Sequence, residues 1–251
     1  MTAFVIDRTE LYARSIDVPE GDVQARADEL LQRRLRHEPA AYLMGHREFY
    51  GIDLVVGVGA LIPRPDTEAL VDEALRIAAE CPLPVAVADV GCGTGAIAIA
   101  MATHLPAASV VAIDRYAPAL AIARQNLDRH GLSERVPLLE GDLLAPLRGP
   151  VDLILSNLPY VRSDELPTLD PEIRMYEPRE ALDGGDDGLD LIRRLLTDAS
   201  AYLNPGGVML MEMDPRQIAS ATAFAAAAFP SARLRVVRDL AGRERVLVLQ
   251  T

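Results

Sequence analysis

From Val85 onward the chain alternates between short apolar runs and longer amphipathic segments, and this alternation constrains the fold more than any other feature. The apolar runs are VAVADV, VVAID, VPLLEGD, VDLILSN, GVMLMEM and VLVLQ, and segments such as GAIAIAMATHL, APALAIARQNLDRHG and LDLIRRLLTDASAYL lie between them. Strands that alternate with helices in this way form an open, mostly parallel sheet with helices on both faces. The sequence therefore predicts an α/β fold.

The region before Val85 has a different organisation. DVQARADELLQRRLRH, residues 22–37, has one apolar face and arginines in its last turn, which predicts a helix. EFYGIDLVVGVGAL, residues 48–61, mixes β-branched and aromatic residues with glycines, as in a short hairpin. IPRPDTEALVDEALRIA then predicts a helix that Asp66 or Thr67 can cap. We expect three parts: a short N-terminal helical region (1–47), a β-hairpin linker (48–62) and the α/β domain (63–251).

Composition and charge exclude several classes of protein. The net charge is -12, and nucleic acids are bound chiefly by Lys and Arg that displace counterions, so a nucleic acid is not the expected partner. Cys81 and Cys92 do not form a disulfide framework, and the four histidines lack metal-ligand spacing. No run approaches the roughly 18 apolar residues of a membrane helix, and MTAFVIDRTE does not resemble a signal peptide. We expect a cytoplasmic protein without a structural metal or membrane contact.

A glycine-rich turn, in VADVGCGTGAIAIA, joins the first apolar run to the following helix. Gly91, Gly93 and Gly95 lack side chains, so backbone N–H groups there can approach a ligand closely. Gly91, Gly93 and Ala96 also satisfy the dinucleotide fingerprint, which keeps a nicotinamide cofactor as an alternative. Asp114 ends the next strand about 20 residues later, where a carboxylate can bind a ribose hydroxyl of either cofactor.

Two further acids favour S-adenosylmethionine over a dinucleotide. Asp89 precedes the first glycine by two residues, where its carboxylate can hold an ammonium group. Asp142, in GDLL, follows the third strand and can lie beside an adenine ring. The simpler alternatives are a tight turn without a ligand for the glycines and a helix N-cap for Asp142.

The fourth strand ends in SNLPYV, at the edge where open α/β sheets bind ligands. The Asn157 carboxamide oxygen and the Leu158 backbone carbonyl can both accept hydrogen bonds from a planar NH₂ group, while Pro159 fixes the turn and Tyr160 forms a wall. A planar nitrogen is a poor nucleophile because its lone pair is delocalised. Most of the catalysis would therefore come from holding this nitrogen in line with a methyl donor, and no strong base is required. We predict methylation of an amide or aromatic amine, with a proline-stopped strand and an Asx-type turn as the purely structural alternative.

These motifs, together with REFYG, LIPRPDTE, EPREAL and DGLDLIRRL, resemble the HemK/PrmC family of bacterial methyltransferases, which act on a glutamine of peptide chain release factors. The resemblance extends from Arg33 to Leu249 and implies a class I S-adenosylmethionine methyltransferase fold, Rossmann-like, with a mostly parallel seven-stranded sheet. It implies that residues 157–160 hold the glutamine side chain of the GGQ motif. The cofactor-lining residues that it implies are Gly91, Cys92, Gly93, Thr94, Gly95, Asp114, Asp142, Leu143 and Asn157.

The sequence also departs from the family pattern. The family motif is usually NPPY, and Leu158 replaces its first proline, which keeps the carbonyl but loses the fixed φ. The family carries a longer N-terminal helical domain, and MEMDP at 211–215 replaces a glycine-containing stretch. A relative repurposed for a small metabolite is therefore an alternative hypothesis. Enzymes that methylate a flipped-out adenine share NPPY-like motifs, and a donor-binding module without turnover is a further alternative. The sequence leaves the acceptor and the oligomeric state open.

Overall fold

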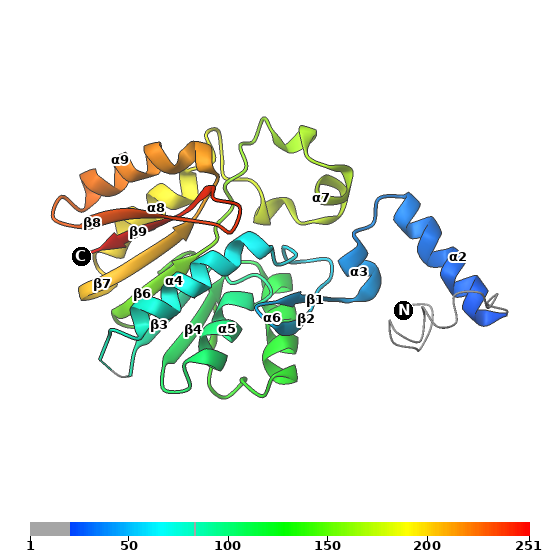
Figure 1. The fold of residues 1–251 in the computed structure, drawn as a ribbon, viewed down its shortest axis with the longest axis horizontal. Helices are drawn as coiled ribbons and strands as arrows, with labels where there is room; N and C mark the ends of the chain where they lie inside the picture. Colours follow the sequence, from blue (N-terminus) through cyan, green and yellow to red (C-terminus); the bar gives the residue numbers. More distant parts are fainter. Residues whose placement is uncertain (1–20, 83) are drawn as a thin grey trace.

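The core of the protein is a seven-stranded sheet. The computed structural model describes residues 21–82 and 84–251 (Figure 1). The strands are β3 (Ala86–Val90), β4 (Ser109–Asp114), β5 (Leu138–Glu140), β6 (Val151–Ser156), β7 (Leu203–Glu212), β8 (Arg233–Arg238) and β9 (Glu244–Gln250), in the order β5-β4-β3-β6-β7-β9-β8. Strand β9 runs opposite to the other six strands of this sheet and is therefore antiparallel to both β7 and β8. The predicted fold class is confirmed.

Helices cover both faces of this sheet, as Figure 1 shows. One face packs against α4 (Glu68–Ala78), α5 (Ala96–His104) and α6 (Ala117–Arg129), and the other packs against α8 (Asp190–Ala199) and α9 (Ile218–Ala228). Within β3, Val87 belongs to the first core, whereas Ala88 and Val90 belong to the second. Successive side chains on a strand point to opposite faces, so buried parallel strands become apolar along their whole length. That is why the strands stand out in the sequence.

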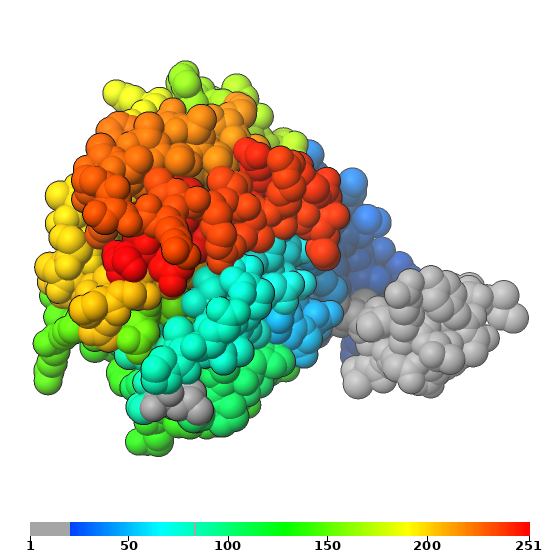
Figure 2. Space-filling model, turned by 60° about the vertical axis from the view of Figure 1, so that its left-hand side comes forward, coloured from blue at the N-terminus to red at the C-terminus, as the bar shows by residue number. Residues whose placement is uncertain are grey.

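Strand β8 is the one strand that the apolar runs did not include. Its sequence, RLRVVR, carries three arginines and lies at the edge of the sheet. Charged residues are common on edge strands because they discourage pairing with other chains. Arg235 forms an ion pair with Glu73 of α4, and Figure 2 shows the C-terminal strands beside α4 (cyan) on one face of the molecule. The charges that suit β8 to an edge also disguise it in the sequence.

The segment before the sheet contains α2 (Asp22–Leu35), α3 (Ala40–Met44), β1 (His46–Phe49) and β2 (Ile52–Val55). The hairpin predicted over 48–61 thus begins and ends earlier than expected, because Tyr50 and Gly51, with φ of 53° and 73°, form its two-residue turn. The Asn126 side chain of α6 bonds both the N–H and the carbonyl of Val55. This docking leads the chain from residue 56 onward into the wall of the functional cleft.

Two other expectations need correction. The helix entrance is a 3₁₀ turn, η1 (Pro65–Thr67), followed by α4, and neither Asp66 nor Thr67 caps it with its side chain. Their side chains are engaged elsewhere, Asp66 with two arginines and Thr67 with Asn157. The polar, proline-bearing stretch from 162 to 188 lacks an apolar run in the sequence and so predicts a long loop, but it contains η2 (Leu166–Thr168), α7 (Pro171–Tyr176) and η3 (Arg179–Ala181). No described helix has the length and apolar character needed to cross a membrane.

Candidate active site

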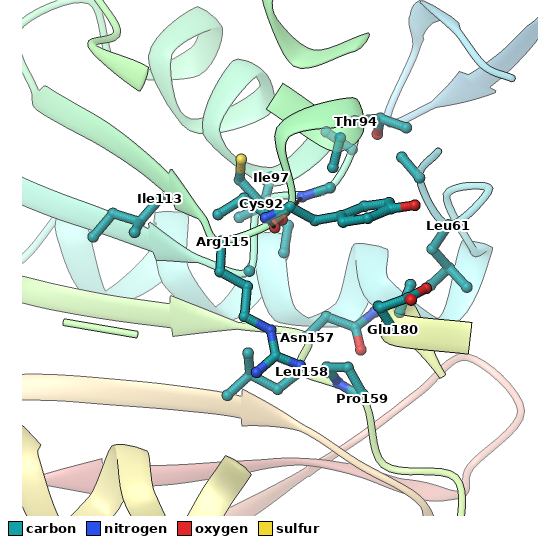
Figure 3. A pocket seen from close by; sticks show the side chains of 18 of the residues that line it. Leu61, Cys92, Thr94, Ile97, Ile113, Arg115, Asn157, Leu158, Pro159 and Glu180 are labelled. Atoms are coloured by element: carbon teal, nitrogen blue, oxygen red, sulfur yellow. Dashed lines mark hydrogen bonds between the residues drawn. The ribbon is translucent and has the colours of Figure 1, made fainter. Parts of the chain in front are cut away.

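A cleft of about 970 Å³, open to solvent, lies at the carboxyl ends of β3, β4, β5 and β6 (Figure 3). Open α/β sheets bind ligands at this edge. Most of the predicted site residues line it, namely Gly91, Cys92, Gly93, Thr94, Asp114, Asp142, Leu143, Asn157, Leu158 and Pro159. The structure therefore brings together motifs that are far apart in the sequence. Asp89, Gly95 and Tyr160 are not part of this lining.

The glycine turn between β3 and α5 depends on the missing side chains. Gly91, Gly93 and Gly95 all have left-handed backbone conformations, with φ of 75°, 56° and 80°. A Cβ atom at Gly91 would lie 2.8 Å from Cδ2 of Leu158, so the turn and the NLPY segment are packed directly against each other. A Cβ atom at Gly95 would instead meet Ala123 of α6. Gly95 therefore serves helix packing rather than the cleft.

Asp114, at the end of β4, is held at the floor of the cleft. Its Oδ2 accepts a hydrogen bond from the Gly93 N–H, and its Oδ1 accepts one from the Tyr116 N–H, both at 2.9 Å. Burial raises the pKa of the Asp114 carboxyl, and these N–H groups oppose that effect. A carboxylate has about four acceptor positions, so these two bonds fix its orientation and leave capacity for ligand hydroxyls.

Asp89 does not face the cleft. It is fully buried, and its Oδ2 accepts a hydrogen bond of 3.0 Å from the Ala98 N–H in α5. Burial raises the pKa of Asp89 to about 7, and its Oδ1 has no partner among the described residues. The strand alternation explains this position, because Asp89 shares the α5 side of β3 with Val87. The geometry does not support the expected direct contact between Asp89 and an ammonium group.

The turn after β5 forms another part of the cleft. Asp142 pairs through Oδ2 with Arg194 of α8, while its buried Oδ1 has no hydrogen-bond partner in the described part of the chain. Leu143 has a φ of 48°, which is rare for a residue with a large side chain. Backbone conformations of this kind are concentrated at ligand-binding sites. The corner is not the helix N-cap considered for Asp142, because only turn residues follow it.

The NLPY segment forms the wall opposite the glycine turn. Figure 3 shows Asn157, Leu158 and Pro159 on one side of the cleft and Cys92, Thr94 and Ile97 on the other. Asn157 donates a hydrogen bond from Nδ2 to Oγ1 of Thr67, at 3.0 Å. This bond engages the donor end of the carboxamide and leaves the oxygen available to a ligand.

Tyr160 lies on the other side of the same segment. It lines a second cavity of about 500 Å³ that shares Asn157, Leu158 and Pro159 with the cleft. Burial raises the pKa of the Tyr160 phenol. Tyr160, which was predicted to form a wall of the ligand site, thus lines the adjoining cavity instead. Residues 157–159 line both cavities.

Several residues that shape the site were not identified from the sequence. Thr67 orients Asn157, and Gln217 of η4 (Pro215–Gln217) donates to the Tyr160 carbonyl at 2.8 Å. Glu177 is buried, pairs with Arg64 and accepts a hydrogen bond from the Ile62 N–H, which fixes the loop beside the cleft. Of these residues, only Glu177 belongs to a motif noted in the sequence, EPREAL. That motif indicated the family and did not predict this contact.

The residues of the cleft fit S-adenosylmethionine. The backbone at Gly93 is open, with no atom within 4 Å of a Cβ position, Asp114 presents fixed acceptor positions, and Ile97, Ile113 and Leu191 supply apolar walls for a planar ring. Within residues 21–82 and 84–251 there is no group of three or more side chains that could bind a metal ion. Fixed acceptor positions for hydroxyls beside apolar walls are what the nucleoside part of S-adenosylmethionine requires.

Comparison with known proteins places this site in a family. The family model for the methyltransferase small domain matches residues 68–169, and that for the PrmC N-terminal domain matches residues 1–45. A release factor glutamine methyltransferase from Geobacter sulfurreducens is 46% identical over 212 residues, which cover 84% of this chain and 73% of that protein. The chain belongs to the release factor glutamine methyltransferase family. The resemblance predicted from the sequence is confirmed.

Other family members and solved structures agree. The family member from Rhodopirellula baltica is 40% identical over 250 residues, which cover 97% of this chain and 84% of that protein. A methyltransferase structure from Pyrococcus furiosus has a TM-score of 0.59 at 16% identity, covering 90% of this chain and 96% of that chain. The ribosomal protein L11 methylase of Lactobacillus delbrueckii has a TM-score of 0.56 at 23% identity, covering 76% and 81%. These two structures share the fold of this chain. Residues 1–20 of the predicted N-terminal region (1–47) lie outside the described residues, and the family's N-terminal model matches residues 1–45.

Proposed function

We propose that this protein methylates the side-chain nitrogen of the glutamine in the GGQ motif of a peptide chain release factor, with S-adenosylmethionine as methyl donor. The observation that carries the proposal is the orientation of Asn157, whose Nδ2 is bound to Thr67 beside the glycine turn. An acceptor oxygen at that place suits an NH₂ group. The names of the relatives, release factor glutamine methyltransferases, support the same substrate.

In this proposal the glycine turn and the strand ends hold the donor. Gly93 allows close approach of the backbone, Gly91 lets the turn pack against Leu158, Asp114 accepts hydrogen bonds from ribose hydroxyls, and the Asp142–Leu143 corner contacts the adenine. Asp89 acts indirectly, by holding the start of α5 through the Ala98 N–H. When bound, S-adenosylmethionine supplies an electrophilic methyl group on a sulfonium.

The NLPY segment positions the acceptor. Asn157 Oδ1 and the Leu158 carbonyl accept the two N–H bonds of the glutamine amide, and Pro159 restrains the turn between them and Tyr160. These acceptors localise the nitrogen lone pair and direct it at the methyl group, so catalysis comes from orientation and electrostatics. Transfer would break the methyl–sulfur bond, leave the donor as a neutral thioether and form the new C–N bond. The nitrogen would then lose a proton to water, because it becomes acidic only as that bond forms.

The test is transfer of an isotopically labelled methyl group to a purified release factor, followed by the mass of the intact protein. We expect one added methyl group on the release factor and none on a variant whose GGQ glutamine is replaced by alanine. Transfer to a small amine or amide but not to the release factor would instead favour the metabolite hypothesis. Donor binding without transfer to any acceptor would favour a binding module.

The cytoplasmic location stays a prediction.

A further inference from the structure

A buried carboxyl group lies behind the NLPY segment and has no part in the chemistry described so far. Glu212 ends β7, where Met211 is paired with Ser156, so Glu212 lies next to Asn157 across the sheet. Glu212 is 1% exposed, and its Oε2 has no hydrogen-bond partner among residues 21–82 and 84–251. A buried carboxyl oxygen without a partner is costly, and such groups call for an explanation.

The polar groups around Glu212 include a route to the site. Burial is the largest influence on the pKa of Glu212 and raises it to about 7, whereas the hydroxyls of Thr67 and Tyr160 lower it as hydrogen-bond donors. Arg245 also lowers this pKa, and Asp66 raises it. Arg245 also forms an ion pair of 3.0 Å with Asp66. Its positive charge is therefore divided between two acids and does not fully balance a charge on Glu212.

Thr67 is bonded to Asn157 and is also one of the groups that lower the pKa of Glu212. A threonine hydroxyl has one proton to donate and can accept hydrogen bonds from other groups. Because the Thr67 oxygen accepts from Asn157 Nδ2, its proton is free to be donated to Glu212. If Thr67 donates that proton to Glu212, the two bonds run in one direction, from the Asn157 amide to the Thr67 hydroxyl and on to the carboxyl group.

This direction decides which end of Asn157 faces the cleft. A carboxamide rotated by half a turn would put Oδ1 against the Thr67 oxygen. The Thr67 hydroxyl would then have to donate its proton to Oδ1 instead of to Glu212. The same rotation would present the Asn157 NH₂ group to the substrate. An NH₂ group there repels a substrate amide NH₂ and attracts a carboxylate.

We propose that Glu212 is a positioning residue that acts through the Thr67 hydroxyl to keep the acceptor end of Asn157 facing the substrate, so that the site selects an amide over a carboxylate. This inference rests on the proposed function. It assigns a discriminating role to two buried side chains, on β7 and before α4, that do not touch the reacting atoms.

The test compares two forms of the release factor, one with the GGQ glutamine and one with glutamate in its place. The glutamine form is measured as substrate, by KM and kcat, and the glutamate form as a competitive inhibitor. The ratio of the inhibition constant to KM reports amide selectivity. Thr67→Val and Glu212→Leu remove the relay, while Thr67→Ser and Glu212→Gln are the matched conservative variants. Gln217→Leu is a structural control, because it disturbs the Tyr160 carbonyl without touching the relay.

We expect Thr67→Val and Glu212→Leu to lower the selectivity ratio by about 10- to 100-fold, the effect of one hydrogen bond to a charged group. Thr67→Ser should keep the wild-type selectivity ratio, and Glu212→Gln should keep part of it. Gln217→Leu should lower kcat and leave the selectivity ratio unchanged. If Glu212→Leu fails to fold, the two threonine variants decide the matter. An unchanged ratio in Thr67→Val would overturn the inference while leaving the proposed function intact. A wild-type protein that methylates no release factor would overturn both.

Discussion

Replacing Gly91 by alanine should destabilise the protein by two separable effects. The φ of 75° at Gly91 lies in the left-handed region, where a Cβ costs about 1 to 2 kcal/mol. The new Cβ would also lie 2.8 Å from Cδ2 of Leu158, and displacing that side chain from its rotamer costs about 0.5 to 1.5 kcal/mol. The free energy of unfolding should therefore fall by about 1.5 to 3.5 kcal/mol, as the two effects add.

Two controls separate these effects in urea denaturation. Gly93 has a φ of 56°, and no atom lies within 4 Å of the Cβ that an alanine would add there. Gly93→Ala should therefore lower the free energy of unfolding by the conformational cost alone. Leu158→Ala truncates a side chain that is 4% exposed and should cost about 2 to 5 kcal/mol. The double variant Gly91→Ala/Leu158→Ala should be about 1 kcal/mol more stable than the sum of its single changes, since the contact is gone. Strict additivity, or equal costs for Gly91→Ala and Gly93→Ala, would refute the packing of Leu158 on the glycine turn.

Three further predictions follow from single side chains. Asp114→Ala should weaken donor binding, measured by calorimetry, at least about tenfold with near-normal kcat at saturation, as expected for a lost bond to a charged acceptor; a selective collapse of kcat would show that the ribose lies elsewhere. Glu177→Gln leaves Arg64 facing a neutral amide, so the thermal midpoint should fall by several degrees, the effect of about 1 to 3 kcal/mol; no change would mean that the loop is held by other contacts. Asp89 has a pKa raised from 3.8 to about 7, so the folded state holds this proton more tightly and stability is lost as pH rises from about 4 through 7. Asp89→Asn should remove up to about 4 kcal/mol of that loss, measured by denaturation at pH 4 and pH 8, and an unchanged slope would contradict the shift.

The sheet and the location of the site were predictable because both depend on local patterns. A parallel strand covered on both faces is a continuous apolar run, as in Val151–Ser156, and the residue after such a strand lies at the ligand-binding edge. Asn157 and Asp114 could therefore be placed at one cleft from their positions alone. Strand β8 escaped notice because its arginines interrupt the pattern, although they suit an edge.

The polar contacts of the site were less predictable because they join distant residues. Thr67 and Asn157 are 90 positions apart, and the local pattern around Thr67 suggested a helix cap. The direction of Asp89 was also missed, since spacing places a residue near the turn, whereas strand alternation decides which face it points to. Glu212 ends an apolar run, and nothing beside it in the sequence indicates that it lies behind Asn157.

The most direct measurement is the effect of Asn157→Ala on turnover and on donor affinity, with a release factor as acceptor. If the Asn157 oxygen holds the substrate nitrogen, kcat should fall by about 30- to 1,000-fold, the effect of losing about 2 to 4 kcal/mol of transition-state stabilisation. The dissociation constant of the donor should change by only a few fold. Equal losses in turnover and donor affinity would show that Asn157 binds the donor instead, and the proposed role of the NLPY segment would be wrong.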